Sequence, residues 1–86
     1  MKSYNLTVSS PDGKLFEGEA VCLSVRGLQG DLAVMAGHIP FVTALKACEM
    51  VIDLPDETDK RGKIEGGSLT VGEDKVTLLT GSVIWS

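Results

Sequence analysis

Hydrophobic and polar residues alternate with a period of two along most of the chain. Leu6 and Val8, for example, flank the polar Thr7. The same alternation recurs at Val21, Leu23 and Val25, at Leu32 and Val34, at Met50 and Ile52, at Leu69 and Val71, and at Val76 and Leu78. Such a period is typical of strands that bury one face and expose the other. Because many short strands are separated by turn residues, the pattern predicts an all-β fold, a two-sheet antiparallel β-sandwich of short strands.

Turn-forming residues lie between these segments. Ser10-Pro11-Asp12-Gly13 predicts a type I turn, and Gly72-Glu73-Asp74 predicts a hairpin tip. Gly66-Gly67 indicates a bulge or a tight corner. The longest polar stretch, residues 54–63, is expected to be a solvated hairpin end. Residues 43–50 contain helix formers, but a helix of two turns is marginal without packing, so a helix there is the less favoured alternative.

The size and charge of the chain limit what it can be. Its 86 residues suffice for one domain, expected to span residues 1–86, with a single compact core. A net charge of −4 argues against nucleic acid as a partner, because an acidic surface repels phosphate backbones. The longest apolar run, residues 32–36, is far shorter than the ~20 residues of a membrane span. Two cysteines outside any C-x-x-C pair, and no signal peptide, favour a reducing compartment with free thiols.

The residues that could carry chemistry are isolated in the sequence. His38 is the only histidine and has no cluster of ligands at metal-binding spacing, so no metal or cofactor is expected. Gly27-Leu28-Gln29-Gly30 lacks the continuation of a phosphate-binding loop. Glu17 and Glu19 share a face of a strand, where solvated carboxylates are the ordinary interpretation. These patterns predict no catalytic site.

Several segments carry apolar residues on both strand faces: Phe41 with Val42, Leu78 with Leu79, and residues 83–85. A small sandwich buries one face of each sheet. The second set of apolar side chains therefore either plugs strand ends or forms an interface with a partner, and the sequence leaves both alternatives open.

Three stretches, "SSPDGKLFEGEA", "VRGLQGDLAVMAGHIPFVTALK" and "EGGSLTVGEDKVTLL", resemble the N-terminal β-sandwich domain of the ε subunit of F-type ATP synthases. The resemblance covers nearly the whole chain. The central stretch carries its most specific pattern, Gly-x-x-Gly-(acid)-Leu followed by Gly-His-x-Pro. The matching residues are Gly27, Gly30, Asp31, Leu32, Gly37, His38 and Pro40.

The resemblance implies a non-catalytic rotor subunit that links the γ subunit to the loops of the membrane c-ring and couples proton translocation to ATP synthesis. It implies a peripheral position at the cytoplasmic face of a bacterial inner membrane. Carried over by position, the residues on the c-ring side are Leu28, Gln29, Gly30 and Asp31. Those on the γ side are Ser10, His38 and Thr43.

The chain departs from the family pattern in several places. Asp31 stands where most members have Glu, and Ala33 and Ala36 replace the frequent Gly and Pro. The usual Leu-Lys-Pro-Gly turn reads Leu-Lys-Ala-Cys at residues 45–48. The sequence given ends at Ser86, before the family's C-terminal helical hairpin. Coupling without the inhibition of ATP hydrolysis, and without ATP binding, is therefore the expectation.

Two other hypotheses belong to different functional classes. A free-standing β-sandwich that binds a small ligand would need a concave pocket with clustered aromatic residues. The aromatic residues available are Tyr4, Phe16, Phe41 and Trp85, which are scattered along the chain. A small hydrolase would have to use His38.

Overall fold

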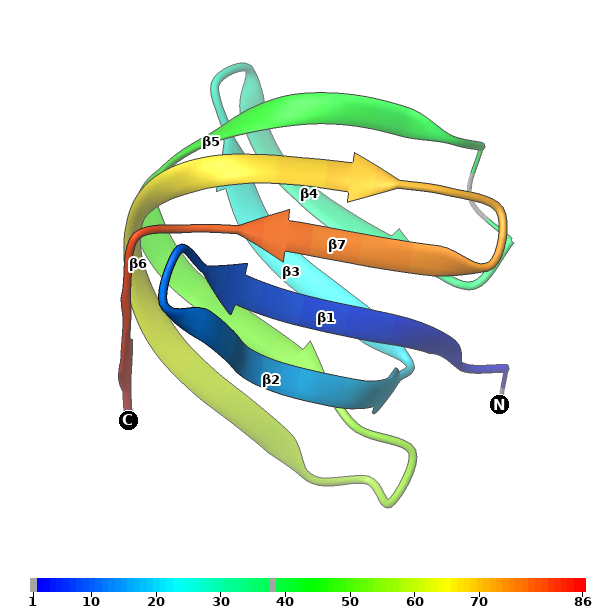
Figure 1. Cartoon of the computed structure of the whole chain (residues 1–86). Coiled ribbons are helices and arrows are strands. Elements are labelled where there is room, and N and C mark those ends of the chain that lie inside the picture. The colour runs from blue at the N-terminus through cyan, green and yellow to red at the C-terminus, as the bar shows by residue number, and fades with distance from the viewer. Residues whose placement is uncertain (1, 38) are drawn as a thin grey trace.

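The computed structural model describes residues 2–37 and 39–86, and its secondary structure there consists of strands and turns (Figure 1). Eight strands follow one another along this part of the chain: β1 (Tyr4–Ser10), β2 (Gly13–Ala20), β3 (Cys22–Gly27), β4 (Gly30–Met35), β5 (Phe41–Asp53), β6 (Asp59–Val71), β7 (Lys75–Leu79) and β8 (Val83–Trp85). The predicted all-β class is confirmed.

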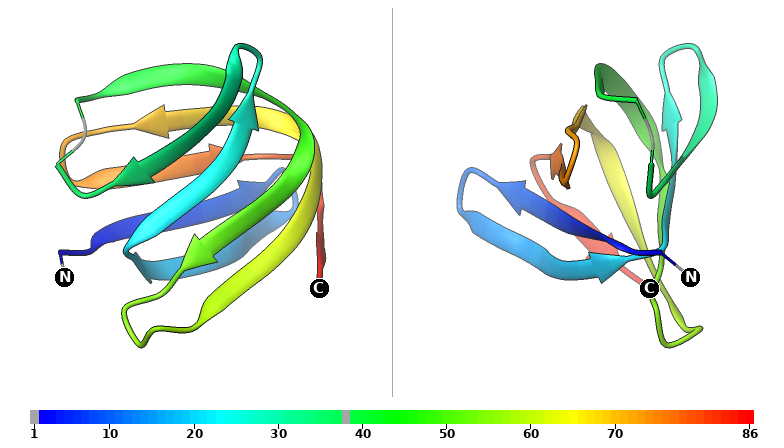
Figure 2. Two further views of the ribbon diagram at one scale, coloured as in Figure 1. Left: turned by 180° about the vertical axis from the view of Figure 1, so that it is seen from behind. Right: turned by 90° about the vertical axis from the view of Figure 1, so that its right-hand side faces the viewer.

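The strands form two packed layers that belong to one hydrogen-bonded sheet. Its order is β2-β1-β7-β6-β5-β3-β4, and β8 pairs with β6. β5 and β6, each of 13 residues, curve out of the layer that contains β1, β2 and β7 and into the layer that contains β3 and β4 (Figures 1 and 2). Two details go beyond the predicted sandwich of short antiparallel strands. These two strands serve both layers, and β1 runs parallel to β7.

The bend of β6 lies at Gly66 and Gly67, as the sequence predicted for a tight corner. Both residues have positive φ, 129° and 153°, where residues with a side chain are strained. A Cβ atom on Gly67 would overlap the carbonyl oxygen of Leu79. The pairing of β6 with β7 ends immediately beyond, at Ser68. The chain can therefore turn between the layers here because glycine leaves room for the neighbouring backbone.

The other predicted turns are largely confirmed. The Asp12 N–H donates to the Ser10 hydroxyl at 3.2 Å, and Gly72 N–H donates to the Lys75 carbonyl at 2.8 Å. Within residues 54–63, only 54–58 form the turn, because Asp59 already begins β6. Residues 43–50 belong to β5, so the alternative of a helix is wrong. Pairing along both edges of the strand outweighs the local helix propensity.

The core lies between the two layers and consists of the alternating apolar residues. Its buried members are Leu6, Val8, Ala20, Leu23, Val25, Val34, Leu45, Met50, Ile52, Ile64, Leu69, Val71, Val76 and Leu78. Tyr4 packs against this core, and its hydroxyl donates at 2.7 Å to the Val34 carbonyl of edge strand β4. Burial raises the pKa of the Tyr4 hydroxyl well above its ordinary value. This hydrogen bond therefore links β1 to β4 with a neutral phenol.

Replacing Gly67 by alanine is expected to destabilise the fold by more than about 2 kcal/mol, since the new Cβ meets backbone at a position of positive φ. Gly81→Ala is the matched control, because a Cβ on Gly81 has no atom within 4 Å, and it should change stability by less than about 0.5 kcal/mol. Urea unfolding measures both variants. Equal stabilities would contradict the proposed corner.

Tyr4→Phe should lower the free energy of unfolding at neutral pH by about 1 kcal/mol, because the Val34 carbonyl loses its donor. The pKa of Tyr4 is higher in the folded than in the unfolded chain, so its stabilisation is complete below about pH 10 and is lost as pH rises further. The wild-type chain should therefore lose stability more steeply above about pH 10 than the variant. Parallel pH profiles in denaturant titrations would refute this role.

Candidate functional site

The hairpin of β3 and β4 ends in a short turn that carries an exposed apolar residue. Gly27 and Gly30 form its last pair, which leaves Leu28 and Gln29 at the tip. Gly30 has φ 131°, a conformation that suits glycine. Leu28 is 59% exposed, and the tip projects beyond β5 (Figure 1). The hairpin thus presents a leucine and an amide on a rigid support.

A groove of about 510 Å³ separates this tip from the beginning of β5. The Leu28 N–H donates to the Ala44 carbonyl at 3.3 Å and fixes the hairpin against β5. Val42 is 71% exposed beside the groove. The lining residues are Gly27, Leu28, Gln29, Gly30, Asp31, Leu32, Phe41, Val42 and Thr43. We call this the tip groove; Asp31 is its one charged lining residue, and the remaining lining is apolar or neutral.

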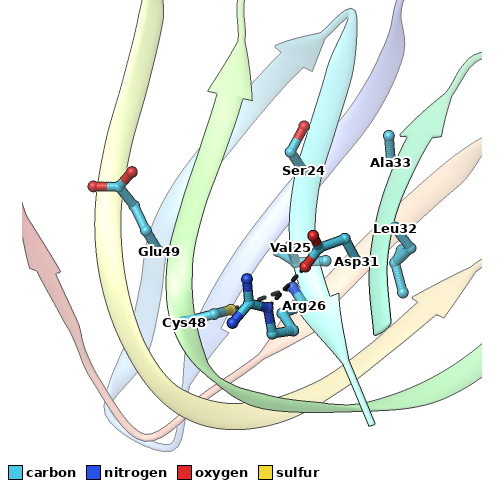
Figure 3. Close-up of a pocket in the computed structure, with 8 residues that line it drawn as sticks. All are labelled: Ser24, Val25, Arg26, Asp31, Leu32, Ala33, Cys48 and Glu49. Atoms are coloured by element: carbon cyan, nitrogen blue, oxygen red, sulfur yellow. Dashed lines mark hydrogen bonds and ion pairs between the residues drawn. The ribbon is translucent and has the colours of Figure 1, made fainter. Parts of the chain in front are cut away.

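A second cavity, of about 480 Å³, lies beside the same hairpin (Figure 3). Arg26 Nε and Asp31 Oδ1 form an ion pair at 2.7 Å across the two strands. The hydrogen bond to Asp31 raises the pKa of Arg26 above its ordinary value. The lining residues are Ser24, Val25, Arg26, Asp31, Leu32, Ala33, Cys48 and Glu49. Asp31 and Leu32 line both spaces, so the start of β4 separates this outer cavity from the tip groove.

A register shift between β3 and β5 positions the hairpin. Ser24 lies opposite Val51 but Gly27 lies opposite Leu45, so β5 has extra residues in this interval. The Arg26 N–H donates instead to the Cys48 sulfur, at 3.4 Å, and both cysteines of the chain are free thiols. The Cys48 side chain therefore supplies the acceptor for a backbone donor beside the shift.

The structure brings most of the predicted contact residues to one place. Leu28, Gln29, Gly30 and Asp31 line the tip groove together with Thr43, which the resemblance assigned to the other partner. Ser10 lies apart, at the end of β1, where its hydroxyl donates to the Gly13 carbonyl at 3.3 Å. The predicted contact at His38 lies outside the described residues.

Sequence reasoning missed two parts of this surface. Phe41 and Val42 form the opposite wall of the tip groove, although their adjacent apolar side chains had marked the segment as unusual. The ion pair of Arg26 with Asp31 was also missed. A two-residue turn at residues 28–29 would have placed these two side chains opposite each other.

The apolar residues on the second faces of strands could either plug strand ends or form an interface, and the structure contains both buried and exposed examples. Phe41, Val83 and Trp85 pack against the core. The remaining ones are exposed: Val42 by 71%, Leu79 by 48% and Ile84 by 69%. Some therefore close strand ends and others are free to meet a partner.

The two carboxylates considered for catalysis, Glu17 and Glu19, are exposed and hydrogen-bonded. Glu17 accepts from Lys14 at 2.8 Å, which lowers its pKa, and Glu19 accepts from the Ser3 hydroxyl at 3.0 Å. Within residues 2–37 and 39–86, no three His, Cys, Asp or Glu side chains gather as a metal site requires. The same residues include no helix with the length and apolar character to cross a bilayer.

None of the cavities considered among the described residues is lined by more than one aromatic residue, whereas a small-ligand module needs several together. Tyr4 and Phe41 line different cavities. Phe16 and Trp85 pack against the core, and Lys60 Nζ lies 4.5 Å from the centre of the Trp85 ring. This arrangement gives no support to the hypothesis of a small-ligand module.

Cys48→Ala should speed hydrogen exchange of the Arg26 amide by about tenfold, because that donor loses its sulfur acceptor. Cys48→Ser should preserve part of the protection, since a hydroxyl also accepts. Cys22→Ala is the control, because Cys22 contacts Ser24 and not Arg26. Amide exchange followed by NMR measures all three variants, and equal protection of Arg26 in all of them would disprove the role of the sulfur.

Comparison with known proteins agrees with this geometry. Residues 3–86 match the family model described as the ATP synthase, Delta/Epsilon chain, beta-sandwich domain. The ATP synthase epsilon chain of Chlorobium limicola is 34% identical over 82 residues, which cover 95% of this chain and 93% of that protein. That of Brevibacillus brevis is 33% identical over 79 residues, which cover 92% of this chain but only 60% of that protein.

Two solved structures share the fold. A chain of the Euglena gracilis mitochondrial ATP synthase, in a structure of OSCP, F1 and c-ring, matches with a TM-score of 0.90 at 20% identity, over 96% of this chain and 53% of that one. A chain from the central stalk and c-ring of the Tetrahymena thermophila mitochondrial ATP synthase matches with a TM-score of 0.78 at 9% identity, over 96% and 66%. Together with the family match and the two epsilon chains, these likenesses lead to one conclusion: the chain belongs to the family of ATP synthase delta/epsilon chains, as a β-sandwich domain.

Proposed function

We propose that this chain is a non-catalytic central-stalk subunit of an F-type ATP synthase, which links the γ subunit to the c-ring and couples proton translocation to ATP synthesis. Its family membership supports the role, and the relatives are named ATP synthase epsilon chain. The observation that carries the proposal is the projecting hairpin with its exposed Leu28 and adjoining tip groove. Among the described residues, the lining of this groove includes one titratable side chain, Asp31, so the surface suits contact with another protein better than chemistry.

The tip of the hairpin is the proposed contact with the c-ring loops. Leu28 offers an apolar side chain that docking would remove from water, and Gln29 offers an amide beside it. The hairpin is fixed by backbone pairing in β3 and β4 and by the hydrogen bond from Leu28 to Ala44. Docking would therefore require little additional ordering of the chain, which favours affinity.

The outer face of β5, β6, β7 and β1 is the proposed contact with γ. Two rows of paired residues cross its middle, and the strand register gives them as Val42, Thr70, Thr77 and Thr7, and as Ala44, Ser68, Leu79 and Ser9. Neither row contains a charge. Packing these two rows against another protein would desolvate hydroxyl and apolar groups rather than ions, which costs less free energy.

The predicted γ-side residues fit this face to different degrees. Ser10 borders it, because Ser10 and Leu79 line one small apolar cavity. Thr43 lies at the tip groove, next to Val42, which belongs to both surfaces. The two proposed contacts are therefore continuous along the start of β5. In the assembled complex, this domain would lie at the cytoplasmic face of a bacterial inner membrane, attached through its partners.

Leu28→Gln tests the role of the hairpin. The variant should bind a purified complex of γ and detergent-solubilised c-ring from the same organism about tenfold more weakly, since an anchor at a docked tip contributes about 1–2 kcal/mol. Ile84→Gln is the matched control. Ile84 is 69% exposed, similar to the 59% of Leu28, but lies on β8, which pairs only with β6.

Surface plasmon resonance with the immobilised partner complex measures both variants. The control should bind like the wild-type chain, and both variants should unfold at the wild-type urea concentration. Wild-type affinity in Leu28→Gln would refute the docking role of the hairpin. Failure of the wild-type chain to bind the complex at all would refute the proposed function.

A further inference from the structure

We infer that Arg26 is a positioning residue for Asp31 and masks the charge of this carboxylate, so that the hairpin docks as an electrically neutral unit. The inference rests on the proposed function, because it concerns how the same hairpin meets its partner. Arg26 does not line the tip groove, so the inference extends the proposed contact with the partner to a residue beyond that groove.

Arg26 and Asp31 lie directly opposite each other, one pair below the Gly27–Gly30 pair that closes the hairpin. Their side chains meet on the outer cavity, where Arg26 Nε lies 2.7 Å from Asp31 Oδ1 (Figure 3). The two side chains are 58% and 77% exposed, so both face solvent. Opposite charges at directly paired positions of two strands attract each other, and this attraction orients the carboxylate toward the outer cavity.

The backbone of Arg26 is held in place on two sides. The Arg26 backbone N–H donates to the Cys48 sulfur beside the register shift, which ties this residue to β5 as well as to β4. Arginine also presents a planar group whose geometry suits a carboxylate. Arg26 is therefore placed to hold Asp31 before any partner arrives.

The neighbouring charged groups form ion pairs with one another rather than with Arg26 or Asp31. Glu49 lines the same cavity but pairs with Arg61 at 3.4 Å, and Arg61 also contacts Asp59 at 3.1 Å. Among the residues that the structure describes, the ion pair recorded for Asp31 is the one with Arg26. Since residues 26–31 contain no other charge, the hairpin has no net charge.

A masked carboxylate changes what a partner meets. A basic group on the partner has to compete with Arg26 for Asp31, so it gains little attraction, and docking should depend weakly on ionic strength. Without Arg26, the hairpin would present a bare carboxylate beside the tip groove. If the partner's surface carries basic or amide donors, the hairpin without Arg26 should then bind it more tightly at low salt than the wild-type hairpin does. This gain should disappear as the salt concentration rises.

The test compares Arg26→Gln, Asp31→Asn, the double variant and the charge-conserving control Arg26→Lys. Affinity for the complex of γ and c-ring is measured at about 20 mM and about 500 mM NaCl, where screening lengths differ severalfold. Arg26→Gln should bind about two- to fivefold tighter than the wild-type chain at low salt and should lose this gain at high salt. The double variant should show neither effect, and Arg26→Lys should behave like the wild-type chain.

The outcomes separate this inference from the proposed function. Binding of the wild-type chain with the same salt dependence as Arg26→Gln would overturn the masking role and leave the function intact. Weaker binding of Arg26→Gln at every salt concentration would also overturn it, because Arg26 would then contact the partner directly. If the wild-type chain did not bind at all, the proposed function would fail, and the inference with it.

Discussion

The antiparallel pairing of β5 with β6 is the constraint on which the rest of the structure depends. It runs from the Phe41–Val71 pair to the Asp53–Asp59 pair and passes through both layers. A strand pair that bends in this way needs a corner, and Gly66 and Gly67 provide it. The first half of the pair is then flanked by β7, and the second half by β3 and β8.

The same bend determines where the candidate docking surface lies. As β5 leaves the layer of β3, the pairing of the two strands shifts in register, and the β3–β4 hairpin extends past β5 instead of following it. Leu28 reaches the Ala44 carbonyl from this position, and the tip groove forms between the hairpin and the beginning of β5. Val42 continues that surface onto the two uncharged rows of the outer face. The register shift between β3 and β5 thus places the tip groove next to the outer face, and the two form one continuous surface.

Sequence patterns predicted the elements better than their arrangement. The alternation at Leu69 and Val71 correctly assigned their buried faces, because a period of two is a local property of a strand. It could not show that β5 and β6 serve both layers, since periodicity gives the face of a residue and not its partners. The alternation also breaks where β5 bends, at the exposed Lys46 and Ala47. The helix formers of residues 43–50 suggested a short helix there, because propensity is a local property that does not include the pairing with β6.

The candidate site was predicted in part. Leu28 to Asp31 are contiguous in sequence, so a hairpin tip there could be expected from the glycines alone. The proximity of Thr43 to that tip depends on the register shift between β3 and β5, which no local pattern encodes. The assignment of partners came from the resemblance to a family, because two uncharged rows of residues and an exposed leucine do not identify what covers them.

The central claim is that the hairpin tip faces the c-ring. A photo-crosslinking amino acid in place of Gln29, in the assembled ATP synthase, tests it most directly, because Gln29 lies at the turn and its side chain is exposed. The account predicts a light-dependent product between this chain and the c subunit, identified by mass spectrometry at a loop of that subunit. A product with γ alone, or none in a complex that has assembled fully, would contradict it.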